Sequence, residues 1–276
     1  MPGISLYTTF LALHFVKAGV SRRVVLSVTH IVFLLSLLLI VDYLVVRGYV
    51  SEFTIPKLER FVSAFLNLPT NPDIPGSFWS HLATTLYELG VAWLIVIGII
   101  LPLAFVIGIK RTVKDVMEPL LLTFYAIPSI ILYPAIYLML GIGPSSKIAL
   151  GVLVGSSFLI IYVLSVVYYI NWDLLKMGRV FTNSQVRLFW KVGFPSILPI
   201  LVSAIQIGVS YTIVGVIVGE VIVSSSGLGF LVSWAETTIR VPELYATIAI
   251  AIIFSLAFII SLNLLELHVK GRWKTI

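Results

Sequence analysis

The chain has 276 residues, of which 59% are hydrophobic and only 11% are charged, and its formal net charge is +6. A soluble domain usually carries about 25% charged residues, so this chain has too few polar side chains to cover a globular core and is predicted to lie in a lipid bilayer. It contains no cysteine, which excludes disulfides, thiol catalysis and cysteine-based zinc sites. Its Lys and Arg residues stand at the ends of apolar runs and form no continuous patch, so nucleic acid is not expected as a partner.

Six apolar runs are long enough to cross a bilayer, which requires about 20 residues in a helix. A cytoplasmic segment, residues 1–23, precedes them, and its apolar stretch Ile4–Val16 is interpreted as an interfacial helix because it is too short to span. Residues 24–276 are therefore predicted to be an all-α, polytopic membrane domain. The six predicted spans are Val24–Val46, Leu82–Ile109, Val116–Leu140, Lys147–Ile170, Pro195–Val223 and Leu244–His268.

The distribution of Lys and Arg predicts the orientation of these spans, because cytoplasmic loops carry an excess of both residues. With the N-terminus inside, 13 of the 18 Lys and Arg residues fall on the cytoplasmic side. Both termini are therefore predicted to be cytoplasmic, in the cell membrane. The long connection Arg47–His81, which contains an amphipathic stretch from Pro56 to Leu68, is then external, and residues 171–194 are internal.

Charged residues inside the bilayer usually mark function. Among the acids in the predicted spans, Asp42, Glu88 and Glu220 fall near the outer ends of their helices. With no ionisable residue at mid-depth, a proton-driven pump is disfavoured. For Glu220 two interpretations stand, a residue that shapes an outer gate or a wetted helix-end carboxylate paired with an external base, and the second is preferred for any direct role with substrate.

Neutral polar residues recur on two of the predicted spans. Tyr125, Ser129, Tyr133 and Tyr137 are spaced four residues apart, which predicts one face of the third span, with kinks at Pro128 and Pro134. Ser203, Gln206 and Ser210 share a face of the fifth span. These faces either line a translocation pathway or make hydrogen bonds between helices, and the sequence leaves both open. The GxxxG pairs Gly151–Gly155 and Gly215–Gly219 favour close helix contacts.

The internal segment, residues 171–194, is predicted to form two short amphipathic helices joined by a turn. Asp173 is a candidate cap for the first helix, Ser184 for the second, and Gly193 and Pro195 end the segment. One interpretation is a basic loop resting on anionic lipid. The other is an element that docks into a groove of a cytoplasmic partner.

Several blocks of the sequence resemble, in the same order, those of binding-protein-dependent ABC importer permeases of the nitrate, sulfonate and taurine branch. They are EPLLLTFYAIPSIILYPAIYLMLGIGPSSKI at Glu118–Ile148, the internal segment with its ending Val192-x-Phe194-Pro195, and VIVGEVIVSSSGLGFLVSWA at Val216–Ala235. The resemblance extends roughly from Phe53 to Glu266. It implies the type I importer permease fold, with about six transmembrane helices.

The resemblance also implies partners. Two permease subunits, identical or different, would form the pore, a solute-binding protein would dock outside, and two ATPase subunits would dock inside on residues 171–194. This chain would not hydrolyse ATP, since its sequence contains no G-x-x-x-x-G-K-[ST]. No catalytic residue, metal site or cofactor is expected. The residues that the resemblance assigns to ATPase coupling are Asp173, Lys176, Met177, Gly178, Thr182, Asn183, Phe189, Lys191 and Pro195.

The coupling segment departs from the family pattern at two places. Lys176, Met177 and Gly178 stand where the family has E-A-A, which reverses a charge at the first position. Thr182 stands where the family has a glycine, although the neighbouring Asn183 tolerates the left-handed conformation that such a turn needs. Alternatives to the permease are a stand-alone carrier or channel, a membrane scaffold without a pathway, and a membrane enzyme. The residues assigned to a pathway or gate are Tyr125, Ser129, Tyr133, Gln206, Ser210 and Glu220.

Overall fold

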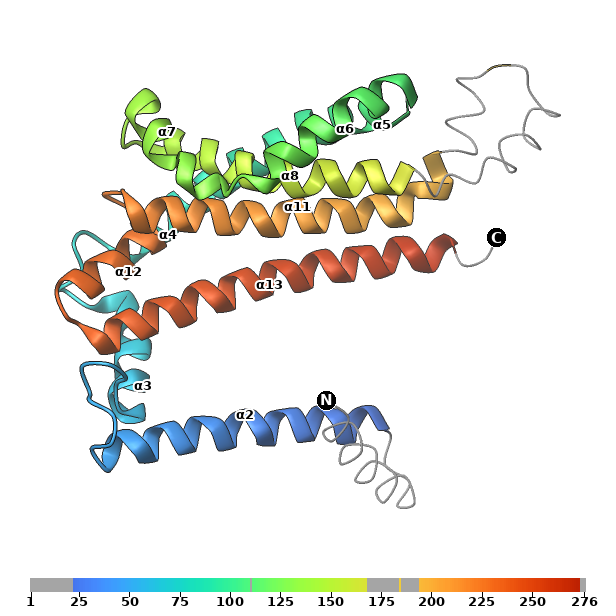
Figure 1. Cartoon of the computed structure of the whole chain (residues 1–276). Helices are drawn as coiled ribbons and strands as arrows, with labels where there is room; N and C mark the ends of the chain where they lie inside the picture. The colour runs from blue at the N-terminus through green and yellow to red at the C-terminus, as the bar shows by residue number, and fades with distance from the viewer. Residues whose placement is uncertain (1–21, 110, 168–183, 185–193, 274–276) are drawn as a thin grey trace. The chain divides into compact units, whose positions relative to one another are not determined.

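A computed structural model of the chain describes residues 22–109, 111–167, 184 and 194–273 (Figure 1). Within these ranges the regular structure is helical and contains no strand, which confirms the all-α prediction. The chain divides into two compact units, residues 1–63 and residues 64–276.

The first unit contains helix α2 (Arg22–Val46) and the beginning of α3 (Leu58–Asn67). Asp42 stabilises the start of α3, because its Oδ1 accepts a hydrogen bond of 2.8 Å from the backbone N–H of Leu58. In the connection, Glu52 pairs with Lys57 at 2.6 Å and with Arg60 at 2.9 Å. The hydrogen bond from Lys57 and the positive charge of Arg60 lower the pKa of the Glu52 carboxyl below its usual value.

The second unit begins with the end of α3 and a short 3₁₀ turn, Leu68–Thr70, and continues into a long apolar helix. This helix consists of α4 (Phe78–Ile95), a π-helical turn η2 (Val96–Ile100) and α5 (Leu101–Ile109). Pro102 has no backbone N–H, so the regular ladder of helical bonds cannot continue through this point, and the π turn accommodates the loss.

The next apolar run is broken into two pieces. Helix α6 (Arg111–Ala126) ends just before Pro128, a 3₁₀ turn η3 (Ser129–Leu132) follows, and α7 (Tyr133–Leu140) continues at an angle of 78°. Pro128 has an extended conformation with ψ of 103°, and the residue before a proline is disfavoured in a helix. The predicted kink is therefore a full break.

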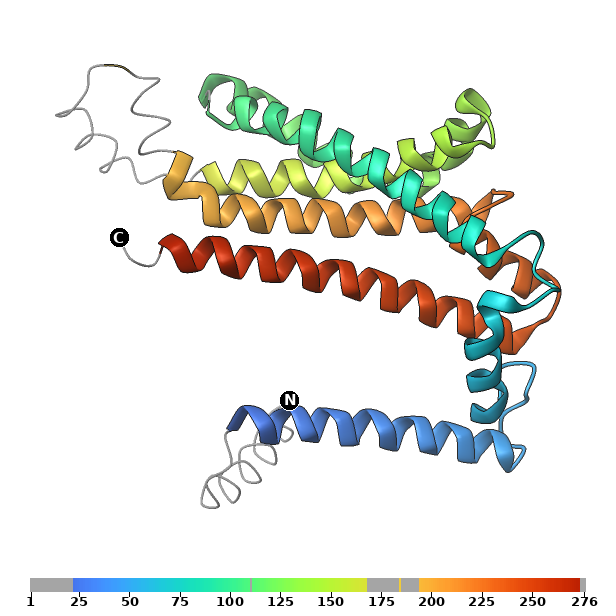
Figure 2. The same cartoon turned by 180° about the vertical axis from the view of Figure 1, so that it is seen from behind.

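Helices α8 (Pro144–Val167) and α11 (Phe194–Ile222) run side by side through the unit (Figures 1 and 2). A Cβ added to Gly215 would lie 2.8 Å from the Cα of Gly151, so this approach requires glycine. The prediction that these glycines mark a close helix contact is confirmed. Leu159, Val163, Leu201 and Ala204 continue the packing into a buried apolar cluster shared with η2 and α5.

Two further helices complete the unit. Helix α12 (Leu228–Thr237), which the sequence pattern does not predict, lies at the end of α11 and leads into α13 (Val241–Trp273) (Figure 1). Five helices of the described ranges are long and apolar enough to cross a bilayer, or up to six if α6, η3 and α7 form one broken span. Between 6% and 44% of each of these five windows is buried, so much of their apolar surface is left to face lipid or other subunits.

Candidate functional site

The N-terminus of α12 is capped by side chains of two other helices. The first backbone N–H groups of a helix have no partner within it. Here the Gly227 N–H donates to Nδ1 of His81 at 3.1 Å, Leu228 N–H to Oγ1 of Thr85 at 2.8 Å, and Gly229 N–H to Oε2 of Glu220 at 2.8 Å. We call this arrangement of His81, Thr85 and Glu220 the α12 cap.

The two glycines of the cap are required by this geometry. Gly227 has φ of +109°, a conformation that other residues rarely adopt, and a Cβ there would collide with the Glu220 carboxylate. A Cβ on Gly229 would lie 2.5 Å from the carbonyl oxygen of Ile217 on α11. The sequence GLG therefore allows the start of α12 to approach Glu220 and the end of α11.

The capping side chains are also bonded to one another and to the preceding loop. Thr85 donates its hydroxyl to Oε1 of Glu220 at 2.7 Å while accepting from Leu228. Because Nδ1 of His81 accepts from Gly227, the ring proton belongs on Nε2, which lies 2.7 Å from the carbonyl oxygen of Pro75. Both oxygens of Glu220 thus accept a hydrogen bond, and the cap joins α4, α11 and α12.

Buried ionisable residues surround this cap. Glu220, Glu88 on α4 and Lys147 on α8 are 0%, 1% and 2% exposed. The Nζ of Lys147 donates to the backbone carbonyls of Ile142 and Gly143. The interpretation of Glu220 as a wetted helix-end carboxylate is therefore wrong. Its environment is made by residues of α4 and α8, which lie far away in the sequence.

A sequence model of the family described as the binding-protein-dependent transport system inner membrane component matches residues 94–275. The match covers more than half of the chain and includes Glu220 and the whole of α12.

The chain belongs to this family.

Curated relatives of the chain support this family assignment. A probable ABC transporter permease of Haemophilus influenzae is 30% identical over 192 residues, which cover 67% of this chain and 76% of the relative. The taurine transport system permease protein TauC of Escherichia coli is 24% identical over 250 residues, which cover 90% of this chain and 89% of TauC. The resemblance described from the sequence blocks is confirmed, and the chain is an ABC transporter permease subunit rather than a stand-alone carrier.

A solved structure supports the fold. The MetNI methionine ABC transporter in an inward-facing conformation matches the permease with a TM-score of 0.53 at 20% sequence identity, covering 69% of this chain and 93% of that one. The family consists of transport permeases, which agrees with the assignment of a non-catalytic subunit. The described residues contain no group of three or more His, Cys, Asp or Glu side chains that would hold a metal ion.

The polar face predicted for the third span of the permease does not exist as one face. Tyr125 precedes the break at Pro128, whereas Ser129 lies in the 3₁₀ turn and Tyr133 begins α7, so the four-residue spacing crosses a change of direction. Tyr125 is exposed and packs edge-on against Phe158. Tyr133 is fully buried, and its hydroxyl donates to the carbonyl oxygen of Gly219 at 3.0 Å. Tyr133 therefore ties α7 to α11 in this conformation.

The polar residues of the fifth span have partners within the permease. Gln206 donates from Nε2 to Oδ1 of Asn263 on α13 at 2.6 Å, and the Ser210 hydroxyl donates to the Gln206 carbonyl at 2.8 Å. This supports the interhelical interpretation for Gln206. Both side chains are only partly buried, so the same face is also accessible from outside the unit.

Most of the predicted coupling residues lie outside the described residues: Asp173, Lys176, Met177, Gly178, Thr182, Asn183, Phe189 and Lys191. Pro195 is the second residue of α11, where proline is tolerated because the N–H of the first helical turn needs no helical partner.

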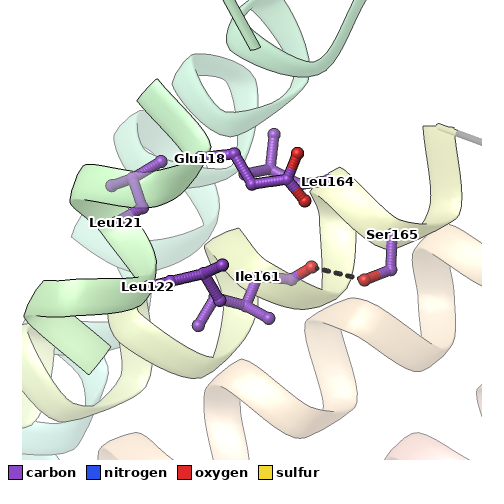
Figure 3. A pocket seen from close by; sticks show the side chains of 6 residues that line it. All are labelled: Glu118, Leu121, Leu122, Ile161, Leu164 and Ser165. Carbon is purple, nitrogen blue, oxygen red and sulfur yellow. Dashed lines mark hydrogen bonds between the residues drawn. The ribbon is translucent and has the colours of Figure 1, made fainter. Parts of the chain in front are cut away.

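A small pocket lies between α6 and α8 (Figure 3). Four apolar side chains line it together with Glu118 and Ser165, whose hydroxyl donates to the Ile161 carbonyl at 3.0 Å. Glu118 is 3.9 Å from Lys114 on the same helix. The lining of the pocket is mostly apolar and offers no set of convergent polar groups that would orient a solute. We therefore assign the pocket no binding role.

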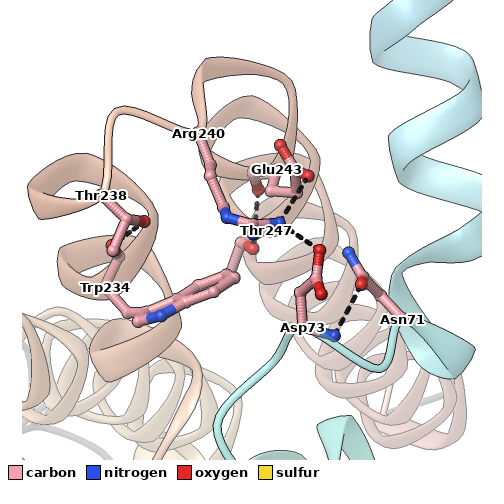
Figure 4. A network of polar contacts seen from close by, with 7 residues as sticks. All are labelled: Asn71, Asp73, Trp234, Thr238, Arg240, Glu243 and Thr247. Atoms are coloured by element: carbon pink, nitrogen blue, oxygen red, sulfur yellow. Dashed lines mark hydrogen bonds and ion pairs between the residues drawn. The ribbon is translucent and has the colours of Figure 1, made fainter.

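The C-terminal end of α12 is held by a second, exposed network (Figure 4). Arg240 bonds Asp73 at 2.7 Å, lies 3.6 Å from Glu243 and stacks over the ring of Trp234 at 5.3 Å. The hydrogen bond and negative charge of Asp73 raise the pKa of Arg240 above its usual value. The network thus joins the loop before α4 to the turn between α12 and α13.

Sequence reasoning missed three members of this site, His81, Thr85 and Lys147. In the sequence, His81 ends the predicted external connection, Thr85 carries no signal, and Lys147 is the first residue of a predicted span. The block Val216–Ala235 contains Glu220 together with Gly227 and Gly229, and the spacing of these three residues is the sequence signal for this site. The partners of the cap on α4 are more than 130 residues away from it in sequence.

Proposed function

We propose that this permease forms a solute pathway across the cell membrane with a second permease subunit, and that two cytoplasmic ATPase subunits drive it. A solute-binding protein would deliver the solute from outside. The observation that carries the proposal is the family match over residues 94–275, which includes the segment proposed to couple to the ATPases. ATP hydrolysis would take place on the ATPase partners, because this sequence has no phosphate-binding loop of the Walker type.

The charge distribution supports the orientation. Residues 171–194 contain four of the basic residues assigned to the cytoplasmic side, and both termini lie on that side in the same assignment. The α12 cap and the Arg240 network are then at the outer end of the permease. We propose that Glu220 shapes the outer gate there by fixing α12.

The conformational cycle would be a rigid-body change in which ATPase closure is transmitted through the coupling segment. The residues proposed to make that contact are the predicted set around Phe189 and Lys191. Tyr125, Ser129, Gln206 and Ser210 are proposed to face the pathway in at least one state. Their neutral side chains give no charge to select a particular solute.

A co-purification experiment tests the coupling. Phe189→Asp places a charge on the apolar side of the second predicted helix, and Lys191→Glu reverses a charge. We expect each variant to reduce the amount of ATPase subunit that co-purifies with the full-length permease by at least about tenfold, the loss of a 1.4 kcal/mol contact. Arg60→Glu, on the opposite side of the proposed topology, is the control and should leave the amount unchanged. Unchanged co-purification with both loop variants would contradict the proposed contact.

Cysteine labelling tests the orientation separately. The chain has no cysteine of its own, so Arg187→Cys and Arg60→Cys each introduce a single site. In intact cells, a membrane-impermeant maleimide should label the second variant only. Labelling of both or of neither from outside would contradict the topology.

A further inference from the structure

The turn between α12 and α13 contains a strained residue. Ile239 has φ of +56°, and among the described residues it is the one residue other than glycine with a positive φ. A side chain that branches at Cβ is an outlier in this left-handed conformation, because its Cβ crowds the neighbouring backbone. The strain of the turn therefore comes from the kind of residue at this position.

The backbone conformation of Ile239 has a clear structural purpose. The Ile239 N–H donates to the carbonyl oxygen of Glu236 at 3.1 Å, and the Arg240 N–H donates to that of Ala235 at 2.8 Å. These two bonds form a Schellman motif, which ends a helix with one residue in the left-handed conformation. Glycine usually occupies that position, and asparagine sometimes does, because both tolerate a positive φ. The motif thus explains the backbone but not the isoleucine.

Packing among the described residues does not explain the isoleucine either. Ile239 is 67% exposed, and the three residues before it, Glu236, Thr237 and Thr238, are exposed as well. A single exposed apolar residue needs no explanation by itself. Here, however, the exposed side chain stands where it strains the backbone, and strain of this kind is concentrated at functional contacts. Burial inside the unit cannot offset it.

The charges around the turn indicate what kind of partner fits it. Arg240 brings Asp73 and Glu243 to the turn (Figure 4). A third acid, Glu236, is exposed at the end of α12. Three acids against one base give the turn a net negative charge, and charged groups are costly in hydrocarbon, so the turn faces water. A water-soluble protein with an apolar pocket and a basic border is complementary to this surface.

We propose that Ile239 is the apolar anchor through which a water-soluble protein docks on the outer end of the permease, with the acids around the turn facing a basic border on the partner. The identity of this partner as the solute-binding protein rests on the proposed function. Ile239 directly follows α12, the helix whose other end is held by Glu220. Docking would therefore act on the element proposed to shape the outer gate.

Stability and binding should change in opposite directions when the side chain of Ile239 is removed. Ile239→Gly relieves the strain, so we expect the melting temperature of the full-length permease in lipid nanodiscs to rise by about 2–4 °C. In a titration on immobilised nanodiscs, the same variant should bind the purified solute-binding protein at least about tenfold more weakly, as for loss of an interface hot spot. Ile239→Leu keeps an apolar side chain of equal size and is the control, with affinity within about twofold of the wild type.

Ile239→Asn repeats the test with a polar side chain that also tolerates a positive φ, and it should weaken binding to a similar extent. Unchanged affinity in both the glycine and asparagine variants, or an equal loss in Ile239→Leu, would overturn the proposal. So would a melting temperature that falls in Ile239→Gly. If that variant is stabilised in detergent but destabilised in nanodiscs, lipid and not a protein covers Ile239. A wild-type permease that binds no solute-binding protein would contradict the proposed function as well, whereas wild-type binding that survives Ile239→Gly contradicts the docking site alone.

Discussion

The two ends of α12 are held by polar networks of opposite kinds. At its N-terminus, Thr85 and Glu220 are fully buried and accept hydrogen bonds from backbone N–H groups. Because these N–H groups are buried as well, water cannot take the place of the two side chains. At its C-terminus, the side chains of Arg240 and Asp73 are 35% and 55% exposed, and water and salt compete with their ion pair. Burial, more than the number of contacts, therefore decides which end fixes the helix.

Removing Glu220 should have the largest effect. Glu220→Ala leaves the Gly229 N–H and the Thr85 hydroxyl without their buried acceptor, and each unpaired buried group costs about 1–3 kcal/mol, more where the lost partner is charged. The melting temperature of the purified permease measures this loss. Glu236→Ala, at an exposed position of α12 itself, is the matched control and should change little. Equal effects of the two variants would show that the cap does not hold α12.

Adding a methyl group at Gly227 should be the next most damaging change. Gly227→Ala forces a non-glycine residue to φ of +109° and drives its Cβ into Glu220, and backbone strain of this kind costs about 1–3 kcal/mol before the collision is added. Gly90→Ala is the control, because a Cβ there meets no atom within 4 Å and alanine is the better helix former. We expect thermal melting to show a loss for the first variant and none for the second.

Thr85→Val tests the hydroxyl alone, since valine has nearly the same shape. It removes the acceptor of the Leu228 N–H and the donor to Glu220, and leaving such a buried group unpaired costs about 1–3 kcal/mol. Thr84→Val, at the adjacent position, removes only a hydroxyl bonded to the Ser80 carbonyl. A comparison of the two melting temperatures should show the larger decrease at position 85. The reverse order would contradict the cap geometry.

The smallest effect is expected at the exposed end. Arg240→Ala removes the ion pair with Asp73 and the contact with Trp234, and surface pairs of this kind contribute about 0–1 kcal/mol. The difference from the wild type should shrink further in high salt, because the exposed charges are then screened. A loss as large as that of Glu220→Ala, unaffected by salt, would remove the distinction between the two ends.

Local patterns in the sequence were sufficient for part of this structure. The apolar runs predict the membrane helices, and the GxxxG spacings at Gly151 and Gly215 predict close helix contacts, because each signal depends on residues close together in the chain. That α8 and α11 are the two helices in contact is seen only in the structure. The periodic polar face failed at Pro128, since a periodicity argument assumes a continuous helix. Pro128 predicts a kink in a continuous helix, whereas the structure has a full break there.

The site itself depends on contacts that spacing does not encode. Glu220 seemed wetted because it lies near a helix end, and only the packing of α4 and α8 around it makes it buried. Thr85 and Glu220 are 135 residues apart in the chain. The short helix α12 also gave no periodic signal of its own, although the GLG sequence that begins it has a clear steric reason once Glu220 is in place.

The proposed function makes this chain a passive permease whose movements are driven by ATP hydrolysis on other subunits. Proteoliposomes that contain the permease with its ATPase and binding-protein partners measure it most directly, through uptake of radiolabelled solute against a gradient. We predict uptake that requires ATP and stops when the ATPase subunits are omitted. Uphill uptake by the permease chain alone, without nucleotide, would contradict the account.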